Sequence, residues 1–283
     1  MEADKRKQSD KKADFSVLMS LYFSEKAEYF ELCIKSILGQ TVKPTEIVIV
    51  KDGPVTDKVE KVLQQYIKKY PAMFYILSYA TNHGLGYALA EGVKACKYEL
   101  IARMDTDDIA RKDRFERQLA EFEKDSELDI CGGSIYEFEG EPSNIVAKRH
   151  VPLTDREIKI YQKRRDAFNH VTVMFKRSAV LDAGNYQSCL LMEDSLLWVH
   201  MMQNGVKCKN VKEPLVYVRI GEEMYSRRGG FSYFLKYKNG RKKILETGYI
   251  SRWDYYCTLM AQFFVALIPS RIRGWIFKKL LHH

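Results

Sequence analysis

Asp105 and Asp107 are the pair of side chains with the clearest capacity for chemistry in this sequence. They directly follow the hydrophobic run 98–102, which predicts a buried strand ending at the ligand-binding edge of an open α/β sheet. Alternate residues of an extended segment point to the same side, so the two carboxylates can converge on one ion. Oxygen ligands suit Mg²⁺ or Mn²⁺, which commonly keeps substrate phosphates in its coordination shell. We predict a divalent metal site for a nucleotide diphosphate, with Asp108 as the N-cap of a helix over 109–124.

A second acidic pair, Glu193 and Asp194, stands at the start of a helix predicted over 194–204. Acids are common in a first helical turn because they complement the helix dipole, and this is the structural alternative. In the functional interpretation, Asp194 is a general base that deprotonates an acceptor hydroxyl as it attacks a sugar carbon, and Glu193 orients it. His170 precedes a predicted strand over 171–175 and is interpreted either as an acceptor-binding residue or as a core histidine.

Polar residues that follow two other predicted strands can reach the same sheet edge. Asp52 ends the second strand and is placed to accept a hydrogen bond from a base N–H or a ribose hydroxyl, although an Asp-Gly turn explains it equally simply. Asn82, His83 and Gly84 open the next helix, whose free N–H groups can face a phosphate. A turn with a solvent-facing His83 is the alternative.

Two arginines, Arg227 and Arg228, precede a pair of glycines. A basic loop of this kind can close over phosphates, where arginine binds in a bidentate manner, but it can also be an ordinary solvated loop. The sequence has neither a P-loop nor a Gly-x-Gly-x-x-Gly motif. A P-loop nucleotidase or a dinucleotide-binding domain is therefore not indicated.

The elements that must position these residues alternate between strands and helices. Hydrophobic runs predict strands over 15–20, 46–50, 73–79 and 98–102, with helical spacing between them. This alternation predicts an α/β domain with a mainly parallel, Rossmann-like sheet flanked by helices. Later segments predict helices over 114–124 and 153–165 and strands over 130–138 and 211–220.

Composition limits the domain organisation. With 283 residues and 46% hydrophobic residues, the chain can form one large domain with a short appendage, and we place this domain at 14–250. Residues 1–13 are polar and are interpreted as a disordered leader without a secretory signal. The six cysteines include no Cys-x-x-Cys pair, which indicates reduced core residues and a cytoplasmic protein.

The C-terminal segment 251–283 has a different character. From Arg227 onward, twelve Lys and Arg stand against two acids, so this end carries the excess behind the net charge of +9. The apolar run 257–268 is shorter than the ~20 residues a spanning helix needs. Residues 271–281 place Trp275 and several aliphatic side chains on one helical face among basic residues, which is typical of a helix in a membrane interface. Packing of this helix on the domain is the alternative.

Taken in order, seven motifs resemble those of the GT-A family 2 glycosyltransferases, most closely the bacterial exopolysaccharide, capsule and O-antigen branch. The resemblance covers about residues 14–230. The motifs are SVLMSLY (16–22), SILGQT (36–41), IVKDGP (49–54), NHGLG (82–86), ARMDTDD (102–108), NHVTVMF (169–175) and MED (192–194).

This resemblance implies an inverting transfer of one sugar from a nucleotide-sugar, usually a UDP-sugar, with Mn²⁺ or Mg²⁺ as cofactor. It implies that Ser20 and Tyr22 lie near the nucleotide, that Asp52 holds the base, and that Asp105 meets the ribose. By the same resemblance Asp107 binds the metal and Asp194 is the base. Arg103, which lies within the fifth motif, is placed with the residues that bind the nucleotide-sugar.

The expected partners are the nucleotide-sugar and a lipid-linked saccharide acceptor. A basic and partly apolar tail fits an acceptor on a membrane lipid, so we expect a peripheral enzyme on the cytoplasmic face of the plasma membrane. The family's processive members have spanning helices and a Gln-x-x-Arg-Trp motif, which this sequence lacks.

Two other classes compete with this reading. A sugar-phosphate nucleotidyltransferase is the first alternative, but it would be expected to carry a glycine-rich basic loop after the first strand, where 20–24 has no glycine. A nucleic-acid-binding protein is the second. The basic residues of the C-terminal end alternate with apolar helix faces, so we expect a membrane rather than nucleic acid as their partner.

Overall fold

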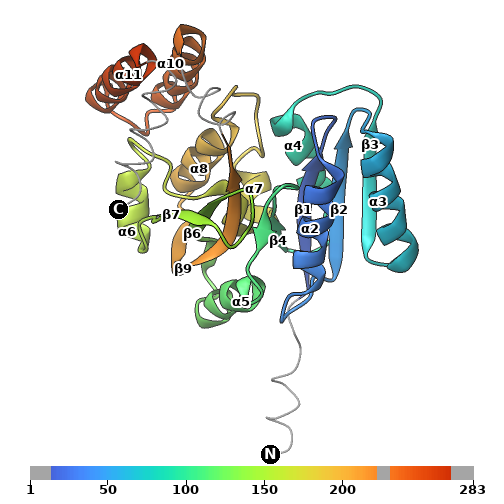
Figure 1. Ribbon diagram of the computed structural model, residues 1–283. Helices are drawn as coiled ribbons and strands as arrows, with labels where there is room; N and C mark the ends of the chain where they lie inside the picture. The colour runs from blue at the N-terminus through green and yellow to red at the C-terminus, as the bar shows by residue number, and fades with distance from the viewer. Residues whose placement is uncertain (1–13, 222–229, 269–283) are drawn as a thin grey trace, which may run out of the picture.

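A computed structural model describes residues 14–221 and 230–268 of the chain as a central sheet enclosed by helices (Figure 1). Its first half alternates strands and helices, as the hydrophobic runs predict. These elements are β1 (Phe15–Leu21), α2 (Ala27–Leu38), β2 (Glu46–Asp52), α3 (Asp57–Lys69), β3 (Phe74–Tyr79), α4 (Leu85–Ala95) and β4 (Leu100–Arg103). The four strands run parallel in the order β3, β2, β1, β4, so their carboxyl ends meet at one edge.

The second half of the sheet mixes directions. Its elements are β5 (Ile109–Ala110), α5 (Arg114–Lys124), β6 (Leu128–Glu139), β7 (Ile145–Arg149), α6 (Asp155–Tyr161), β8 (Met174–Lys176), α7 (Arg177–Asp182), α8 (Glu193–Gln203) and β9 (Lys207–Ile220). β8 is antiparallel to both β4 and β6, β9 is parallel to β6, and β5 and β7 add antiparallel pairs. The predicted α/β fold with a Rossmann-like, mainly parallel sheet is therefore confirmed, and its antiparallel pairs belong to the second half.

Local hydrogen bonds explain why two predicted elements differ from the structure. The strand predicted over 171–175 begins only at Met174, because a short 3-10 turn, η1 (His170–Thr172), precedes it. The Thr172 hydroxyl donates to the Asn169 carbonyl at 2.7 Å and accepts from the Gly133 N–H at 3.0 Å. Such side-chain bonds compete with a strand ladder and favour a turn.

Asp108 is not a helix N-cap. The short strand β5 separates it from α5, and its carboxylate accepts a hydrogen bond from the Arg219 N–H at 2.8 Å. The helix predicted over 153–165 is shortened to α6, which a capping box between Thr154 and Glu157 begins. The glycine predicted to end α8, Gly205, has a φ of +83°, the left-handed conformation that commonly follows a helix.

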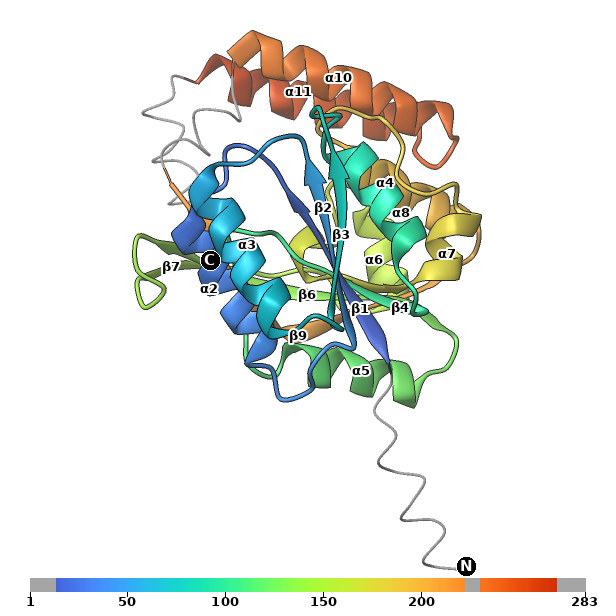
Figure 2. The ribbon, with the colours of Figure 1, turned by 90° about the vertical axis from the view of Figure 1, so that its right-hand side faces the viewer.

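Helices cover both faces of the sheet because alternate residues of each strand are apolar on opposite sides (Figure 2). Val17, Met19 and Leu21 pack in one core with helices α2 and α3, whereas Leu18 packs in a second core with α4 and α8. All six cysteines are free and five are buried, as their apolar surroundings predict.

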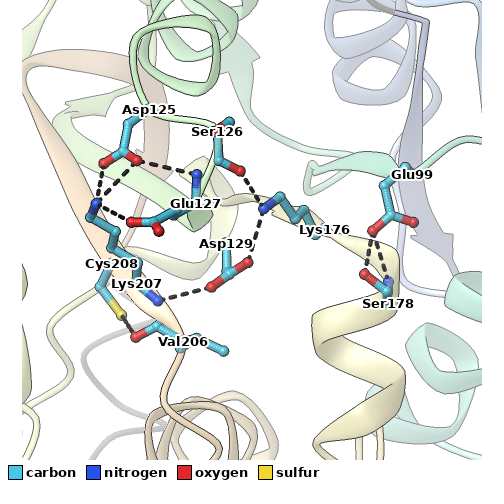
Figure 3. A network of polar contacts seen from close by, with 10 residues as sticks. All are labelled: Glu99, Asp125, Ser126, Glu127, Asp129, Lys176, Ser178, Val206, Lys207 and Cys208. Carbon is cyan, nitrogen blue, oxygen red and sulfur yellow. Dashed lines mark hydrogen bonds and ion pairs between the residues drawn. The ribbon is translucent and has the colours of Figure 1, made fainter.

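A polar network fixes the end of β6 and β9 that lies away from their carboxyl termini (Figure 3). The Lys207 ammonium bridges Asp125 and Glu127, at 2.8 and 3.1 Å, and the backbone N–H of Lys207 donates to Asp129 at 2.9 Å. Asp129 also accepts from Lys176 at 3.1 Å. Exposed ion pairs of this kind stabilise a fold only slightly, so the network chiefly sets the register where β6, β8 and β9 meet.

Two further helices, α10 (Gly230–Glu246) and α11 (Arg252–Leu267), lie side by side at one end of the molecule (Figures 1 and 2). Their inner sides share a third core with α8. Within 14–221 and 230–268, no helix is long and apolar enough to cross a membrane. The predicted leader 1–13, the loop with Arg227 and Arg228, and the amphipathic segment 271–281 lie outside the described residues.

Candidate active site

A cavity of about 970 Å³ opens at the carboxyl edge of the parallel strands. Its wall is formed by the segments that follow β1, β2, β3 and β4, together with the end of β9. Seven residues predicted from the sequence line it: Ser20, Tyr22, Asp52, Asn82, Gly84, Asp105 and Asp107. The strand order thus brings together side chains that lie up to 87 positions apart in the chain.

Asp52 organises one side of this cavity. Its buried carboxylate accepts hydrogen bonds from the backbone N–H groups of His83 and Gly84, at 2.8 and 2.9 Å. The Asn82 amide donates to the Asp52 carbonyl at 3.1 Å, and the φ of +94° at Gly84 favours glycine there. The aspartate therefore holds the loop that opens α4 and remains close enough to the cavity to contact a ligand.

The opposite side of the cavity concentrates negative charge. Glu25, Asp105, Asp107 and Asp108 all contribute to its wall, and Thr106 donates a hydrogen bond to Glu25. Asp107 is exposed to the cavity, and partial desolvation by the surrounding protein, with repulsion from Asp105 and Glu25, raises its pKa to about 6. Burial likewise raises the pKa of Asp108 and of Glu25. The clustered carboxylates of this wall would favour the binding of a cation.

A divalent cation fits the chemistry of this donor set. Asp105 and Asp107 offer carboxylate oxygens whose mutual repulsion a cation would relieve. Among the described residues, no group of three or more His, Cys, Asp or Glu side chains is arranged to hold a metal ion unaided. Phosphate and water oxygens would have to complete the shell, which is the usual arrangement for Mg²⁺ in nucleotide sites.

Asp194 lies in the first turn of α8, partly buried. Its carboxylate accepts from the Ser195 N–H at 2.8 Å. Burial raises its pKa to about 7, and the nearby Asp166 adds to this rise, while Arg103 opposes it. A carboxylate with a pKa near neutrality is well matched to general base catalysis. Glu193, its predicted helper, also has a raised pKa because of burial.

His170 approaches Asp194 with its Nδ1, at 3.9 Å from a carboxylate oxygen. Burial, with the charge of Arg103, lowers the pKa of His170 well below its usual value, so the ring is neutral and the contact is not an ion pair at neutral pH. Its Nε2 lies 2.8 Å from the Tyr186 hydroxyl. His170 is thus a partly buried, hydrogen-bonded residue that adjoins the candidate base, and its role in acceptor binding stays a prediction.

Arg103 connects the acidic cavity wall to the candidate base. It is only 3% exposed and forms an ion pair with Asp105, while its charge also lowers the pKa of Asp194. Among the described residues, its Nε and Nη1 have no hydrogen-bond partner, although both are buried. Such unpaired buried donors are costly. Arg103 does not itself line the cavity, so its contact with a nucleotide-sugar stays a prediction.

The first turns of α4 and α8 also touch each other. A Cβ atom at Gly86 would lie 2.9 Å from the Glu193 Cγ, so only a glycine leaves room for this approach. Asp194 and Glu193 do not line the cavity themselves, but Leu85 does, and it belongs to the same first turn of α4 as Gly86. The two predicted halves of the site are therefore neighbours.

Several residues of the site were not identified from the sequence. Arg219 lines the cavity with its guanidinium 3.7 Å from the centre of the Tyr29 ring and 4.6 Å from that of Phe138. Lys26 and Arg219 are the basic side chains of the cavity wall within the described residues. Neither lies in a recognisable motif, because they approach the acidic cluster only through tertiary contacts.

Comparisons with known proteins agree on one family. The family model described as Glycosyl transferase family 2 matches residues 16–181. The chain is 41% identical to an uncharacterized glycosyltransferase of Haemophilus influenzae, over 82% of this chain and 88% of that protein. It is 33% identical to the UDP-Gal:alpha-D-GlcNAc-diphosphoundecaprenol beta-1,3-galactosyltransferase of Escherichia coli, over 96% of this chain and 98% of that protein.

Solved structures show the same fold at lower identity. The mannosyltransferase PcManGT of Pyrobaculum calidifontis, in complex with GDP-Man and Mn²⁺, aligns with a TM-score of 0.63 at 14% identity, over 99% of this chain and 81% of that chain. TarS 1-349 of S. aureus, in complex with UDP-GlcNAc, aligns with a TM-score of 0.60 at 18% identity, over 95% of this chain and 71% of that chain.

Proposed function

Because the chain belongs to glycosyltransferase family 2 and has the GT-A fold, we propose that this transferase moves one sugar from a UDP-sugar to a hydroxyl of a lipid-linked saccharide. The observation that carries the proposal is the acidic cavity wall at Asp105 and Asp107, which Arg103 connects to a base of matched pKa, Asp194. The matching family and the relatives are glycosyltransferases, which argues against the alternative of a nucleotidyltransferase.

The donor is proposed to lie in the cavity with its nucleotide toward Asp52 and its diphosphate toward the acidic wall. Ser20 and Tyr22, at the end of β1, line the nucleotide end with Asn82 and Gly84. A UDP-sugar is favoured because the galactosyltransferase relative uses UDP-Gal and the TarS complex contains UDP-GlcNAc. Lys26 and Arg219 are placed to contact the diphosphate oxygens.

Departure of the diphosphate needs its developing charge to be neutralised. A divalent cation at Asp105 and Asp107 would supply that neutralisation when bound. Arg103 would hold Asp105 in position for that cation through its ion pair. These groups stabilise the transition state without transferring a proton.

The acceptor hydroxyl is proposed to lose its proton to Asp194 as its oxygen forms the new bond to the anomeric carbon and the bond to the diphosphate breaks. One such displacement inverts the configuration. His170 is neutral, so it can contact the acceptor or orient Asp194 without competing for the proton. An acceptor on a lipid diphosphate, as used by the galactosyltransferase relative, would place the reaction at a membrane surface.

A thermal-shift screen tests the donor assignment, because a ligand that binds only the native state raises its Tm. UDP, GDP, dTDP and CMP are each compared with and without Mn²⁺. We expect UDP with Mn²⁺ to give the largest rise, with Asp107→Asn abolishing the metal-dependent part. A larger response to another nucleotide, or none to any, would overturn the assignment.

A further inference from the structure

We propose that the outward face of α10 and α11 is a docking surface for a lipid bilayer that contains anionic headgroups. The inference rests on the proposed function, because a lipid-linked acceptor would bring the reaction to a bilayer. A row of large, exposed hydrophobic side chains on α11 carries it. They are Trp253, Tyr256, Met260, Phe263, Phe264 and Leu267, which we call the α11 row.

The α11 row occupies a single face of the helix. Apart from the adjacent Phe263 and Phe264, its members are spaced three or four positions apart, and all fall within an arc of about 100° when each residue turns the helix by about 100°. The other side of α11 is buried: Asp254, Tyr255 and Thr258 pack toward the domain. The Arg164 side chain is ion-paired with Asp254 at 2.6 Å and fixes this orientation. The helix is therefore held by one face, and the other presents an apolar surface.

Hydrophobic side chains that are exposed together on one face are typical of an interaction site, whereas single exposed hydrophobic residues are ordinary. Trp253 is 71% exposed and Leu267 is 63% exposed, so the surface extends along the whole helix. Phe231 and Leu235 of α10 are exposed as well. Aromatic residues such as Trp253 and Tyr256 are typical of the headgroup level of a bilayer, and aliphatic and phenyl groups of the layer beneath it.

The charges of the two helices select an anionic surface. Apart from Lys243, which donates to the Ser188 carbonyl, their exposed charged side chains comprise four bases and one acid: Lys236, Lys238, Lys242, Arg252 and Glu246. A basic group near an anionic membrane contributes on the order of 1 kcal/mol to binding. A second copy of this chain on the same face would instead bring these positive charges together. Charge complementarity therefore favours the bilayer over a dimer.

The docking surface lies at the end of the molecule toward which β1, β2 and β3 run, the same end as the carboxyl edge of these strands (Figures 1 and 2). Its helices contact the segment before the candidate base. A Cβ at Gly240 would lie 2.8 Å from the Met192 Sδ, and Lys243 donates to the Ser188 carbonyl at 2.6 Å. Docking through α11 would thus orient the start of α8, with Asp194, relative to the bilayer.

Vesicle co-sedimentation of the full chain tests the proposal. The wild type and the double variant Phe264→Glu/Leu267→Glu are mixed with vesicles of phosphatidylcholine alone or with phosphatidylglycerol added. We expect the wild type to bind the mixed vesicles more strongly, and the double variant to lose at least tenfold in binding. The control is Ile145→Glu on β7, a comparably exposed hydrophobic residue outside the docking surface, which should bind as the wild type does.

Two further readouts separate this proposal from the proposed function. The UDP-dependent thermal shift and transfer to a soluble, short-chain acceptor should be unchanged in the double variant, since the α11 row is remote from the cavity wall. Their failure in the wild type would count against the function and not against docking. Absence of wild-type binding to both vesicle types, or equal binding by the double variant, would refute docking. A wild-type dimer that the double variant splits, without vesicle binding, would identify a second copy as the occupant.

Discussion

At the scale of single residues, the site combines groups whose protonation differs from that of the free amino acids. Burial holds Asp194 near a pKa of 7, whereas burial keeps the adjacent His170 neutral. One group can therefore accept a proton close to neutral pH while its neighbour does not titrate there. This division of roles leads to three predictions.

The first prediction concerns the pH dependence of catalysis. Since Asp194 must be ionised to accept a proton, kcat/KM should rise with pH through about 7 and fall about tenfold for each pH unit below it. Initial rates measured from pH 5 to pH 9 check this. A profile that is flat between pH 6 and 8 would be inconsistent with Asp194 as the base.

The second prediction concerns Arg103, whose charge lowers the pKa of Asp194. Arg103→Gln should move the acidic limb of the pH profile to higher pH and weaken donor binding, because Asp105 loses its partner. Arg117→Gln, on the outer side of α5, serves as the control and should leave the limb in place. If the acidic limb of the pH profile stayed at the same pH in Arg103→Gln, the guanidinium would not be lowering the pKa of Asp194.

The third prediction links the base to stability. A carboxyl group whose pKa rises from 3.8 in the unfolded chain to about 7 in the fold stabilises the fold below pH 3.8 and progressively loses that contribution up to pH 7. Asp194→Asn should therefore raise Tm relative to the wild type, and more at pH 8 than at pH 5. Each kcal/mol corresponds to about 2–4 °C. A decrease in Tm at pH 8 would contradict the pKa assignment.

Residue types and spacing selected seven of the residues that line the cavity, because Asp52, Asn82, Asp105 and Asp107 stand where strands end at one edge. They did not reveal the partners supplied by distant segments. Arg219 comes from the end of β9 and Tyr186 from the loop after α7, and both contribute through packing that no local pattern records. Asp108 was misassigned because its hydrogen bond to Arg219 also depends on that long-range pairing.

At the scale of elements, glycines in α4 mark two different close approaches. A Cβ at Gly92 would lie 2.3 Å from the Leu18 Cδ1 in the core, whereas one at Gly86 would lie 2.9 Å from Glu193 at the site. Gly92→Ala should therefore lower stability by about 1–3 kcal/mol through overpacking. Gly86→Ala should lower kcat with a smaller change in Tm, because it displaces the start of α8.

Denaturant unfolding and initial-rate kinetics on both glycine variants test this difference. Equal effects of the two substitutions on stability and on kcat would argue against separate roles for the two contacts. The repeated strand and helix units of the first half were predictable because their strands are long and apolar. The bounds of β8 were not, since the strand predicted over 171–175 begins only at Met174, after a turn fixed by Thr172.

At the scale of the whole molecule, the chain places a cavity, a candidate base and an amphipathic pair of helices on connected elements. The third core, which includes Met192 and Leu196 of the α8 region, Ile244 of α10 and Tyr255 of α11, makes this connection. The charge and apolar spacing of the C-terminal end led to the prediction of a membrane-associating segment, and this stays a prediction. The sequence could not show that α10 and α11 pair, because their packing depends on contacts with α8.

The separate roles proposed for Asp107 in metal binding and for Asp194 as the base are tested most directly by comparing two variants in parallel. Asp194→Asn and Asp107→Asn are each assayed for sugar transfer and for the Tm rise with UDP and Mn²⁺. We expect Asp194→Asn to retain the Tm rise and lose at least a hundredfold in transfer, and Asp107→Asn to lose both. Transfer near the wild-type rate by Asp194→Asn, or an intact metal-dependent Tm rise in Asp107→Asn, would contradict the account.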